Sequence, residues 1–349
     1  MFHKEHYSLS LARTKAVTVA QKISERSRIV LDYLQNFPNT SKRTLAEKIY
    51  SANKLLFNNS EDARALINRL TGSKGKSELS RKKVEHVTNF SGDNPFGLPA
   101  TEAKPFEPYI LPKANNNILF LSDIHLPYHD IHALTLALNY GKEKDVNTIY
   151  LNGDIMDCYK ASFHEQDPKK RDMSYEFDVC RQFLDLLVKE FPHAKIFFKQ
   201  GNHEARWERF LRVKAPIVLD MEEFRIEVLL KLREKGIEWI PNSQLVKAGK
   251  LNMIHGNEYK GGGGINVART LWLRAGDNVI AGDKHKTQTG LKTNIDKKIV
   301  GTWSVGCLCE LNPDYLVFNE WNLGFAHIEI FGNGDFAVHN KQIINDKIL

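Results

Sequence analysis

Five short apolar segments, each followed directly by polar residues, do most to constrain the fold of this chain. The segments begin near residues 118, 148, 195, 251 and 279 and have the character of β-strands. Patterns typical of amphipathic helices separate several of them, as in residues 177–191. Because strands that alternate with helices form layered folds, the sequence predicts an α/β sandwich. After residue 299 the pattern is mostly strand and turn, which predicts a closing hairpin.

The polar residues that follow these segments are acids, histidines and an amide. In chain order they are Asp123 with His125, Asp154, Asn202 with His203, His255, and Asp283 with His285. The carboxyl ends of strands converge in open α/β sheets, so we expect these side chains to meet. Carboxylate, imidazole and amide oxygen together suit Mn, Fe, Zn or Mg. A single histidine after a strand is more often a hydrogen-bonded structural residue, so the metal hypothesis depends on all five clusters occurring in order.

These clusters resemble, in the same order, the signature of the calcineurin-like metallophosphoesterases, which is D-x-H, G-D-x-x-D, G-N-H-E, H-G and G-H-x-H. The resemblance covers about residues 117–344, and residues 306–315 and 321–325 are similar to the subgroup found in phages and prophages. It implies that residues 114–349 form a β-sandwich flanked by helices. It also implies an enzyme that hydrolyses phosphoester bonds with two divalent metal ions.

The resemblance further implies a role for each residue of the signature. One ion would be held by Asp123, His125 and His285, the other by Asn202 and His255, with Asp154 bridging both. His203 would act as a general acid on the leaving oxygen rather than as a ligand. Arg206, three residues later, is either a phosphate clamp or a charge on a helix surface.

Two positions depart from the family pattern. Asp283 replaces the first histidine of G-H-x-H, and as a harder ligand it favours Mn²⁺ or Mg²⁺ over Zn²⁺. We therefore expect Mn²⁺ first, with Mg²⁺, Fe or Zn²⁺ as alternatives. Protein phosphatases of the superfamily carry Arg-Gly after G-D-x-x-D, whereas Cys158 follows Asp157 here. This difference argues against a Ser/Thr protein phosphatase.

The N-terminal quarter has a different character. Residues 1–90 hold 17 Lys and Arg against 8 Asp and Glu, whereas the remainder holds 32 against 34. Three helical patterns fill residues 1–75: one from about Thr14 to Gln35, one starting at Thr44 with Glu47 in a capping box, and one after Ser60. Such a basic domain is compatible with a helix-turn-helix module that binds DNA, or with a packing or oligomerisation domain. Residues 76–113 are basic and then proline-rich, which predicts a linker.

The bulk composition adds a few limits. No apolar run reaches the roughly 18 residues that span a bilayer, and the first ten residues do not resemble a signal peptide, so a cytoplasmic protein is expected. Four cysteines are too few for a disulfide scaffold and predict buried thiols. The leading hypothesis is a phosphodiesterase, specifically a nuclease acting on DNA. The alternatives are a phosphomonoesterase or protein phosphatase on the same scaffold, and a DNA-binding regulator with a degenerate metal site.

Overall fold

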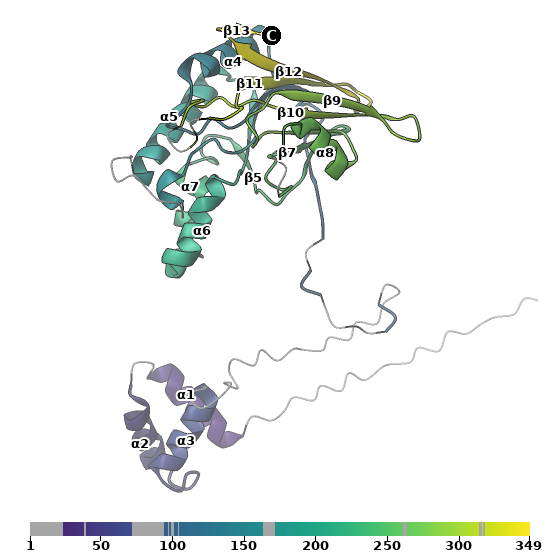
Figure 1. Ribbon diagram of the computed structural model, residues 1–349. Helices are drawn as coiled ribbons and strands as arrows, with labels where there is room; N and C mark the ends of the chain where they lie inside the picture. Colours follow the sequence, from purple (N-terminus) through teal and green to yellow (C-terminus); the bar gives the residue numbers. More distant parts are fainter. Residues whose placement is uncertain are drawn as a thin grey trace, which may run out of the picture. The chain divides into compact units, whose positions relative to one another are not determined.

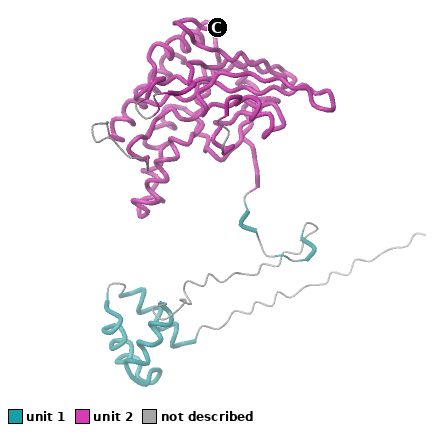
Figure 2. Tube along the Cα trace, in the orientation of Figure 1, with its two compact units in different colours: residues 1–104 teal, residues 105–349 magenta. Residues whose placement is uncertain are grey.

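The chain divides into two compact units, Met1–Lys104 and Pro105–Leu349 (Figure 2). The computed structural model describes residues 24–37, 40–71, 94–96, 98, 101–103, 105–162, 172–260, 264–313, 316 and 318–349. The first half of the helix expected from Thr14 and much of the expected linker lie outside these residues. None of the described helices is both long and apolar enough to cross a bilayer.

Three helices form the described core of the first unit (Figure 1). They are α1 (Glu25–Asn36), α2 (Lys42–Ala52) and α3 (Ser60–Thr71). Val30, Ile49 and Ile67, one from each helix, are fully buried against one another. The capping box expected at Thr44 is wrong: α2 begins two residues earlier, because the Ser41 side chain accepts a hydrogen bond from the Thr44 N–H at 3.2 Å.

The second unit contains a seven-stranded sheet. Its strands in spatial order are β13 (Lys347–Ile348), β12 (Phe336–Ile344), β11 (Leu323–Ile330), β2 (Asn117–Leu121), β3 (Thr148–Leu151), β4 (Lys195–Lys199) and β5 (Glu238–Ile240). Strands β2 to β5 are parallel, whereas β11 runs antiparallel to β2 and forms a hairpin with β12. The expected strands at residues 118, 148 and 195 and the closing hairpin are therefore confirmed.

A six-stranded sheet faces the first one. Its order is β1 (Tyr109–Ile110), β6 (Val246–Ala248), β7 (Leu251–Ile254), β8 (Val279–Ala281), β10 (Ile299–Ser304) and β9 (Gln288–Thr293). Side chains alternate across a strand, and β2 shows the result. Phe120 packs between the two sheets and stacks on Tyr150 at a centroid distance of 5.6 Å, whereas Leu119 and Leu121 face the helices.

Helices cover the outer faces of both sheets, so the predicted α/β sandwich is confirmed (Figure 1). Helices α4 (Ile131–Glu143) and α5 (Met173–Glu190) pack on the seven-stranded sheet, and α8 (Val267–Ala275) packs on the six-stranded sheet. The remaining helices are α6 (Glu204–Lys214), α7 (Ile226–Leu229) and three short 3₁₀ turns, η1 (Tyr159–Ala161), η2 (Pro216–Val218) and η3 (Glu222–Phe224). Strands β2, β3, β4, β7 and β8 end next to the polar clusters found in the sequence.

Candidate metal centre

The loops after β2, β3 and β8 place the candidate ligands in a left-handed backbone conformation. The φ angle is 55° at Asp123, 52° at His125, 51° at Asp154, 60° at Asp283 and 54° at His285. Residues other than glycine rarely adopt this conformation, and it is concentrated at functional sites. Five of the predicted ligands therefore share one uncommon local structure, which the surrounding fold must hold in place.

The carboxylate of Asp154 lies between histidines from two different loops. Its Oδ1 accepts the backbone N–H of His203 at 2.8 Å and lies 3.3 Å from Nε2 of His255. Its Oδ2 lies 3.6 Å from Nε2 of His203. Burial raises the pKa of Asp154, but the surrounding histidines lower it well below its usual range. Asp154 is therefore an ionised carboxylate with both oxygens available to the site.

Asp123, His125 and His285 form a second close group. Oδ1 of Asp123 and Nε2 of His125 each lie 3.3 Å from Nε2 of His285. All three side chains are buried. Burial lowers the pKa of His285, but the Asp123 carboxylate raises it to about 10. The same negative field that retains a proton here would attract a metal cation.

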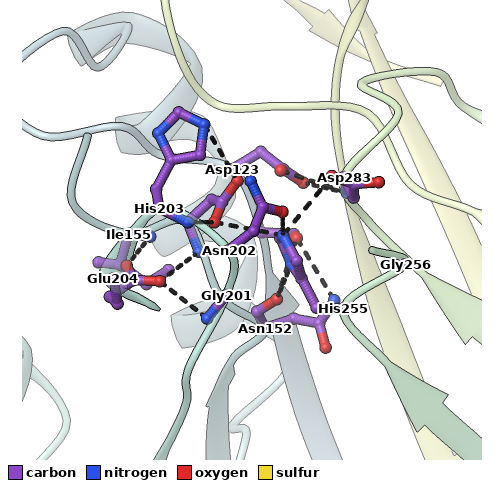
Figure 3. A network of polar contacts seen from close by, with 12 residues as sticks. Asp123, Asn152, Ile155, Gly201, Asn202, His203, Glu204, His255, Gly256 and Asp283 are labelled. Carbon is purple, nitrogen blue, oxygen red and sulfur yellow. Dashed lines mark hydrogen bonds and ion pairs between the residues drawn. The ribbon is translucent and has the colours of Figure 1, made fainter. Parts of the chain in front are cut away.

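His255 makes a third set of contacts, with Asn202 and Asp283 (Figure 3). Its Nδ1 donates to the backbone oxygen of Asn152 at 2.6 Å, so Nε2 faces the site. That nitrogen lies 3.2 Å from Oδ1 of Asn202 and 3.9 Å from Oδ1 of Asp283. Burial lowers the pKa of His255, but nearby carboxylates, Asp154 foremost, raise it well above its usual value. Oxygen atoms of Asp154, Asn202 and Asp283 therefore lie near Nε2 of His255, and all of them could bind the same ion.

This donor set fits a pair of divalent cations. Three groups of side chains each offer ligand atoms that lie within 4.8 Å of one another inside the group. They are His125 with Asp154 and His203, Asp123 with Asp154 and His255, and His125 with His285 and Cys309. Buried carboxylates are costly unless cations compensate them. The ion pair of Lys284 with Asp283 at 2.5 Å offsets one charge, and the protons held by His285 and His255 offset those of Asp123 and Asp154 until divalent cations take their place. Because Asp154 belongs to two of the groups, two ions could share this carboxylate.

Asp157, His203 and Arg206 form a linked set at the edge of the site. Oδ1 of Asp157 lies 3.1 Å from Nδ1 of both His125 and His203. Burial raises the pKa of Asp157, but these two histidines lower it below its usual range. Arg206 reaches back from α6, donating to the Asp157 backbone oxygen at 3.0 Å and to Nε2 of His203 at 2.8 Å. Arg206 therefore contacts the candidate acid directly, although the contacts do not themselves assign it to a phosphate.

Glu204 fastens two of the site loops together. Its side chain is fully buried and accepts four backbone N–H groups (Figure 3). Oε1 accepts from Ile155 at 2.7 Å and Met156 at 2.9 Å, and Oε2 accepts from Gly201 at 2.8 Å and Asp154 at 3.0 Å. One carboxylate thereby fixes the loop after β3 against the loop after β4.

Two glycines of the signature are required by close approach. A Cβ at Gly201 would lie 2.2 Å from Oδ1 of Asp154, and a Cβ at Gly282 would lie 2.0 Å from Oγ of Ser122 and 2.5 Å from Oδ2 of Asp123. Such contacts are far inside van der Waals distance. Glycine at these positions lets neighbouring loops approach closely enough for the carboxylates to share one site.

The structure brings all nine predicted site residues into one connected group. Sequence reasoning gave no role to Asp157, Glu204, Asn152 or Cys309, which contact that group. Asp157 and Glu204 stand inside the signature motifs, so their positions could have signalled a role. Cys309 is one of the four cysteines for which the sequence predicts buried thiols, and all four are buried and free.

Another group of potential ligands lies on β11 and β12. His339 contacts Glu329 at 2.9 Å, and its ring stacks on that of His327 with centroids 5.3 Å apart and an interplanar angle of 17°. An imidazole binds metal in its ring plane. Two parallel stacked rings cannot both direct a lone pair at one ion, so this arrangement fits a cross-strand pair that stabilises the hairpin.

Comparison with known proteins agrees with the signature in the sequence. The family model described as calcineurin-like phosphoesterase matches residues 117–306, which is more than half of the chain. The chain is also similar to the Gene 54 protein of Mycobacterium phage L5, with 24% identity over 238 residues. That alignment covers 62% of this chain and 90% of the phage protein.

Proposed function

Because the chain belongs to the calcineurin-like phosphoesterase family, a family of metal-dependent phosphoester hydrolases, we propose that it is a two-metal phosphodiesterase that cleaves DNA. The observation that carries the proposal is Asp154, whose two carboxylate oxygens lie between His203 and His255. A carboxylate in that position is suited to two ions at once. A pair of divalent cations supplies Lewis acidity toward a phosphoryl group.

The proposed ligands divide into two sets around Asp154. One ion is assigned to Asp123, His125 and His285, and the other to Asn202, His255 and Asp283, with Asp154 common to both. The oxygen and imidazole ligands suit Mn²⁺ best, with Mg²⁺, Fe and Zn²⁺ as alternatives. The role of the protein is to hold these donors in a buried site, where electrostatic effects are strong.

His203 is the proposed general acid. Its Nδ1 donates to Asp157, so Nε2 is the ring atom that would carry a proton to a leaving oxygen. In this structure Arg206 donates a hydrogen bond to the same Nε2. When the imidazole is doubly protonated, neither ring nitrogen can accept a hydrogen bond, so Arg206 must then move away. The freed guanidinium could then bind a phosphate oxygen.

The environment of Asp157 supports a diester over a monoester substrate. The residue after it, Cys158, is fully buried and cannot present a cation to substrate. A phosphomonoester carries more charge than a diester and gains more from such a cation. The absence of a basic residue at this position therefore weakens the binding of a diester less than the binding of a monoester.

The charge of the first unit supports nucleic acid as the substrate. Residues 1–90 carry nine more basic than acidic residues, whereas the rest of the chain is nearly balanced. A separate basic unit can contribute phosphate contacts that do not depend on sequence. We propose that this unit, including α1 to α3, binds DNA and delivers it to the hydrolytic unit.

A metal-by-substrate screen on the purified protein tests this function. The chelator-treated protein receives Mn²⁺, Mg²⁺, Zn²⁺ or Fe²⁺ and is assayed on bis-(p-nitrophenyl) phosphate, p-nitrophenyl phosphate and duplex DNA, with Asp154→Asn as the inactive control. We expect metal-dependent cleavage of the diester and of DNA. Faster turnover of the monoester would favour the phosphomonoesterase alternative, and metal binding without hydrolysis would contradict the proposed enzyme.

A further inference from the structure

The segment formed by residues 306–310 runs alongside the loop that carries Asp123. The N–H of Leu308 donates to the Asp123 backbone oxygen at 3.0 Å, and its carbonyl accepts the N–H of Asp130 at 2.9 Å. Cys309 forms an antiparallel bridge with His129. The segment is therefore fastened by main-chain hydrogen bonds to the first ligand loop, although more than 180 residues separate the two in sequence.

Side chains alternate along this extended segment. Leu308 is fully buried in the core beneath α4 and α5. Its neighbours Cys307 and Cys309 are buried as well, but they belong to the opposite side of the segment. The alternation that places leucine in the core thus places a sulfur next to the metal centre.

Only one of these two thiols joins a group of potential ligands among the described residues. Sγ of Cys309 and one ring nitrogen each of His125 and His285 lie within 4.8 Å of one another. The two histidine Nε2 atoms are 3.3 Å apart. Ligands bound at about 2.3 Å (sulfur) and 2.0 Å (nitrogen) to one ion lie at most about 4.3 Å apart, so a small side-chain rotation suffices.

We propose that the Cys309 thiolate is a further ligand of the ion assigned to Asp123, His125 and His285. This inference rests on the proposed two-metal function. The S–H bond breaks as the sulfur–metal bond forms, and the proton is released to solvent. Sulfur, imidazole and carboxylate form a softer donor set than the signature alone provides. The ion at this position is therefore a borderline metal such as Zn²⁺, Fe²⁺ or Co²⁺, and Mn²⁺ or Mg²⁺ is left to the position with Asp283.

Cys307 provides a matched control. It lies two residues away and is also buried, and its side chain contacts His285 and Cys309 as well as the backbone oxygen of Asn322 at 3.6 Å, but its sulfur belongs to none of the groups of potential ligands among the described residues. Cys180, fully buried in the core on α5, provides a second control remote in sequence from the segment. Serine at any of these positions changes one atom, so the variants isolate the effect of the sulfur.

Cobalt substitution of the full-length protein tests the proposal by spectroscopy. Chelator-treated wild type, Cys309→Ser, Cys307→Ser and Cys180→Ser are each loaded with Co²⁺, and bound cobalt is measured by elemental analysis. We expect a near-ultraviolet thiolate-to-cobalt charge-transfer band in wild type and in the Cys307 and Cys180 variants. Cys309→Ser should lose that band while it retains the visible bands of bound cobalt. Its Zn²⁺ affinity should fall by roughly 10-fold or more, the loss seen even when an outer partner of a ligand is removed.

The possible failures are distinguishable from one another. Wild-type protein that binds two cobalt ions without a charge-transfer band would overturn the role of Cys309 and leave the two-metal function intact. Loss of the band in Cys307→Ser alone would show that the thiolate ligand is Cys307 instead of Cys309, and this result would overturn the proposal. Protein that binds no cobalt would overturn the two-metal function itself. A cooperative thermal unfolding transition in chelator, retained by all four proteins, shows that each variant is folded.

Discussion

At the scale of single residues, Asp154 lies almost fully buried with imidazoles on both sides of its carboxylate. We expect Asp154→Asn to abolish turnover, because an amide carries no charge and offers only one oxygen to two cations. Elemental analysis should show loss of metal together with loss of activity. Full activity in this variant would eliminate the shared-carboxylate arrangement.

His203 tests the proposed division between ligand and acid. We expect His203→Ala to slow hydrolysis by roughly 10²–10⁴-fold, the usual contribution of general acid catalysis. Its metal content should remain near that of wild type, because the ring contacts Asp157 and Arg206 and is not assigned as a ligand. The defect should shrink for substrates whose leaving group needs no proton. Metal loss in this variant would show that His203 is a ligand.

Most of these residues could be predicted from sequence, because the signature places each one directly after a strand. The partners of Asp157 could not, since its contacts with His125 and His203 depend on how two loops face each other. Cys309 was missed for a similar reason. Its position next to His125 and His285 arises from pairing between segments distant in sequence, which no local pattern records.

At the scale of elements, Glu204 joins the loop after β3 to the start of α6. Glu204→Gln keeps the shape of the side chain but turns an N–H₂ group toward two N–H donors. Two buried N–H groups lose their acceptor, at about 1–3 kcal/mol each, so the free energy of unfolding should fall by about 2–6 kcal/mol. Chemical denaturation of metal-free protein measures this. An unchanged unfolding free energy would mean that Glu204 is not needed to hold the loops.

Glu176 on α5 predicts a pH dependence. Burial, followed by the nearby Asp157 carboxylate, raises the pKa of Glu176 to about 8 from the usual 4.5. The folded protein therefore holds a proton that the unfolded chain releases between these values. Stability should fall as pH rises from about 5 to 8, with a slope of at most about 1.4 kcal/mol per pH unit.

Denaturation of wild type and Glu176→Gln across this pH range isolates the effect. The difference in unfolding free energy between the two proteins should change steadily in favour of the glutamine variant as pH rises. Other titrating groups, including the site histidines, contribute equally to both proteins and cancel. A difference that is constant from pH 5 to 8 would contradict a raised pKa at Glu176.

Strands proved easier to predict than helix ends. The segments beginning at residues 118, 148, 195, 251 and 279 were recognisable because buried strands have runs of apolar residues. The start of α2 was misplaced because Ser41 and Thr44 are both acceptable caps in isolation. Only the geometry shows that the Ser41 oxygen accepts the Thr44 N–H.

At the scale of the whole molecule, the proposal assigns DNA binding to the first of the two units and hydrolysis to the second. Removing residues 1–104 eliminates α1 to α3 and the basic excess, while every residue of the candidate centre remains. We expect hydrolysis of a small diester to persist nearly unchanged. Affinity for duplex DNA should fall, and the slope of log affinity against log salt should become shallower by about 0.9 for each DNA phosphate that the truncated protein no longer neutralises.

Salt titrations of DNA binding in metal-free buffer, on full-length and truncated protein, make the comparison. Equal affinity and equal slope for both would show that the first unit does not bind nucleic acid. Light scattering would then test the alternative, since an assembly domain predicts that the full-length oligomer dissociates on truncation. The charge asymmetry was visible in the sequence, but charge alone does not choose between these roles.

The position of β2 between β3 and β11 has a consequence for synthesis of the protein. The strand that leads to Asp123 pairs on one side with residues 148–151 and on the other with residues 326–329. A ribosome must therefore add about two hundred more residues before β2 acquires its second neighbour. His285 and Cys309 also emerge late. A polypeptide terminated before residue 326 could display the first acidic loop but could not enclose it, so hydrolytic competence should appear only after residues 326–329 have been synthesised.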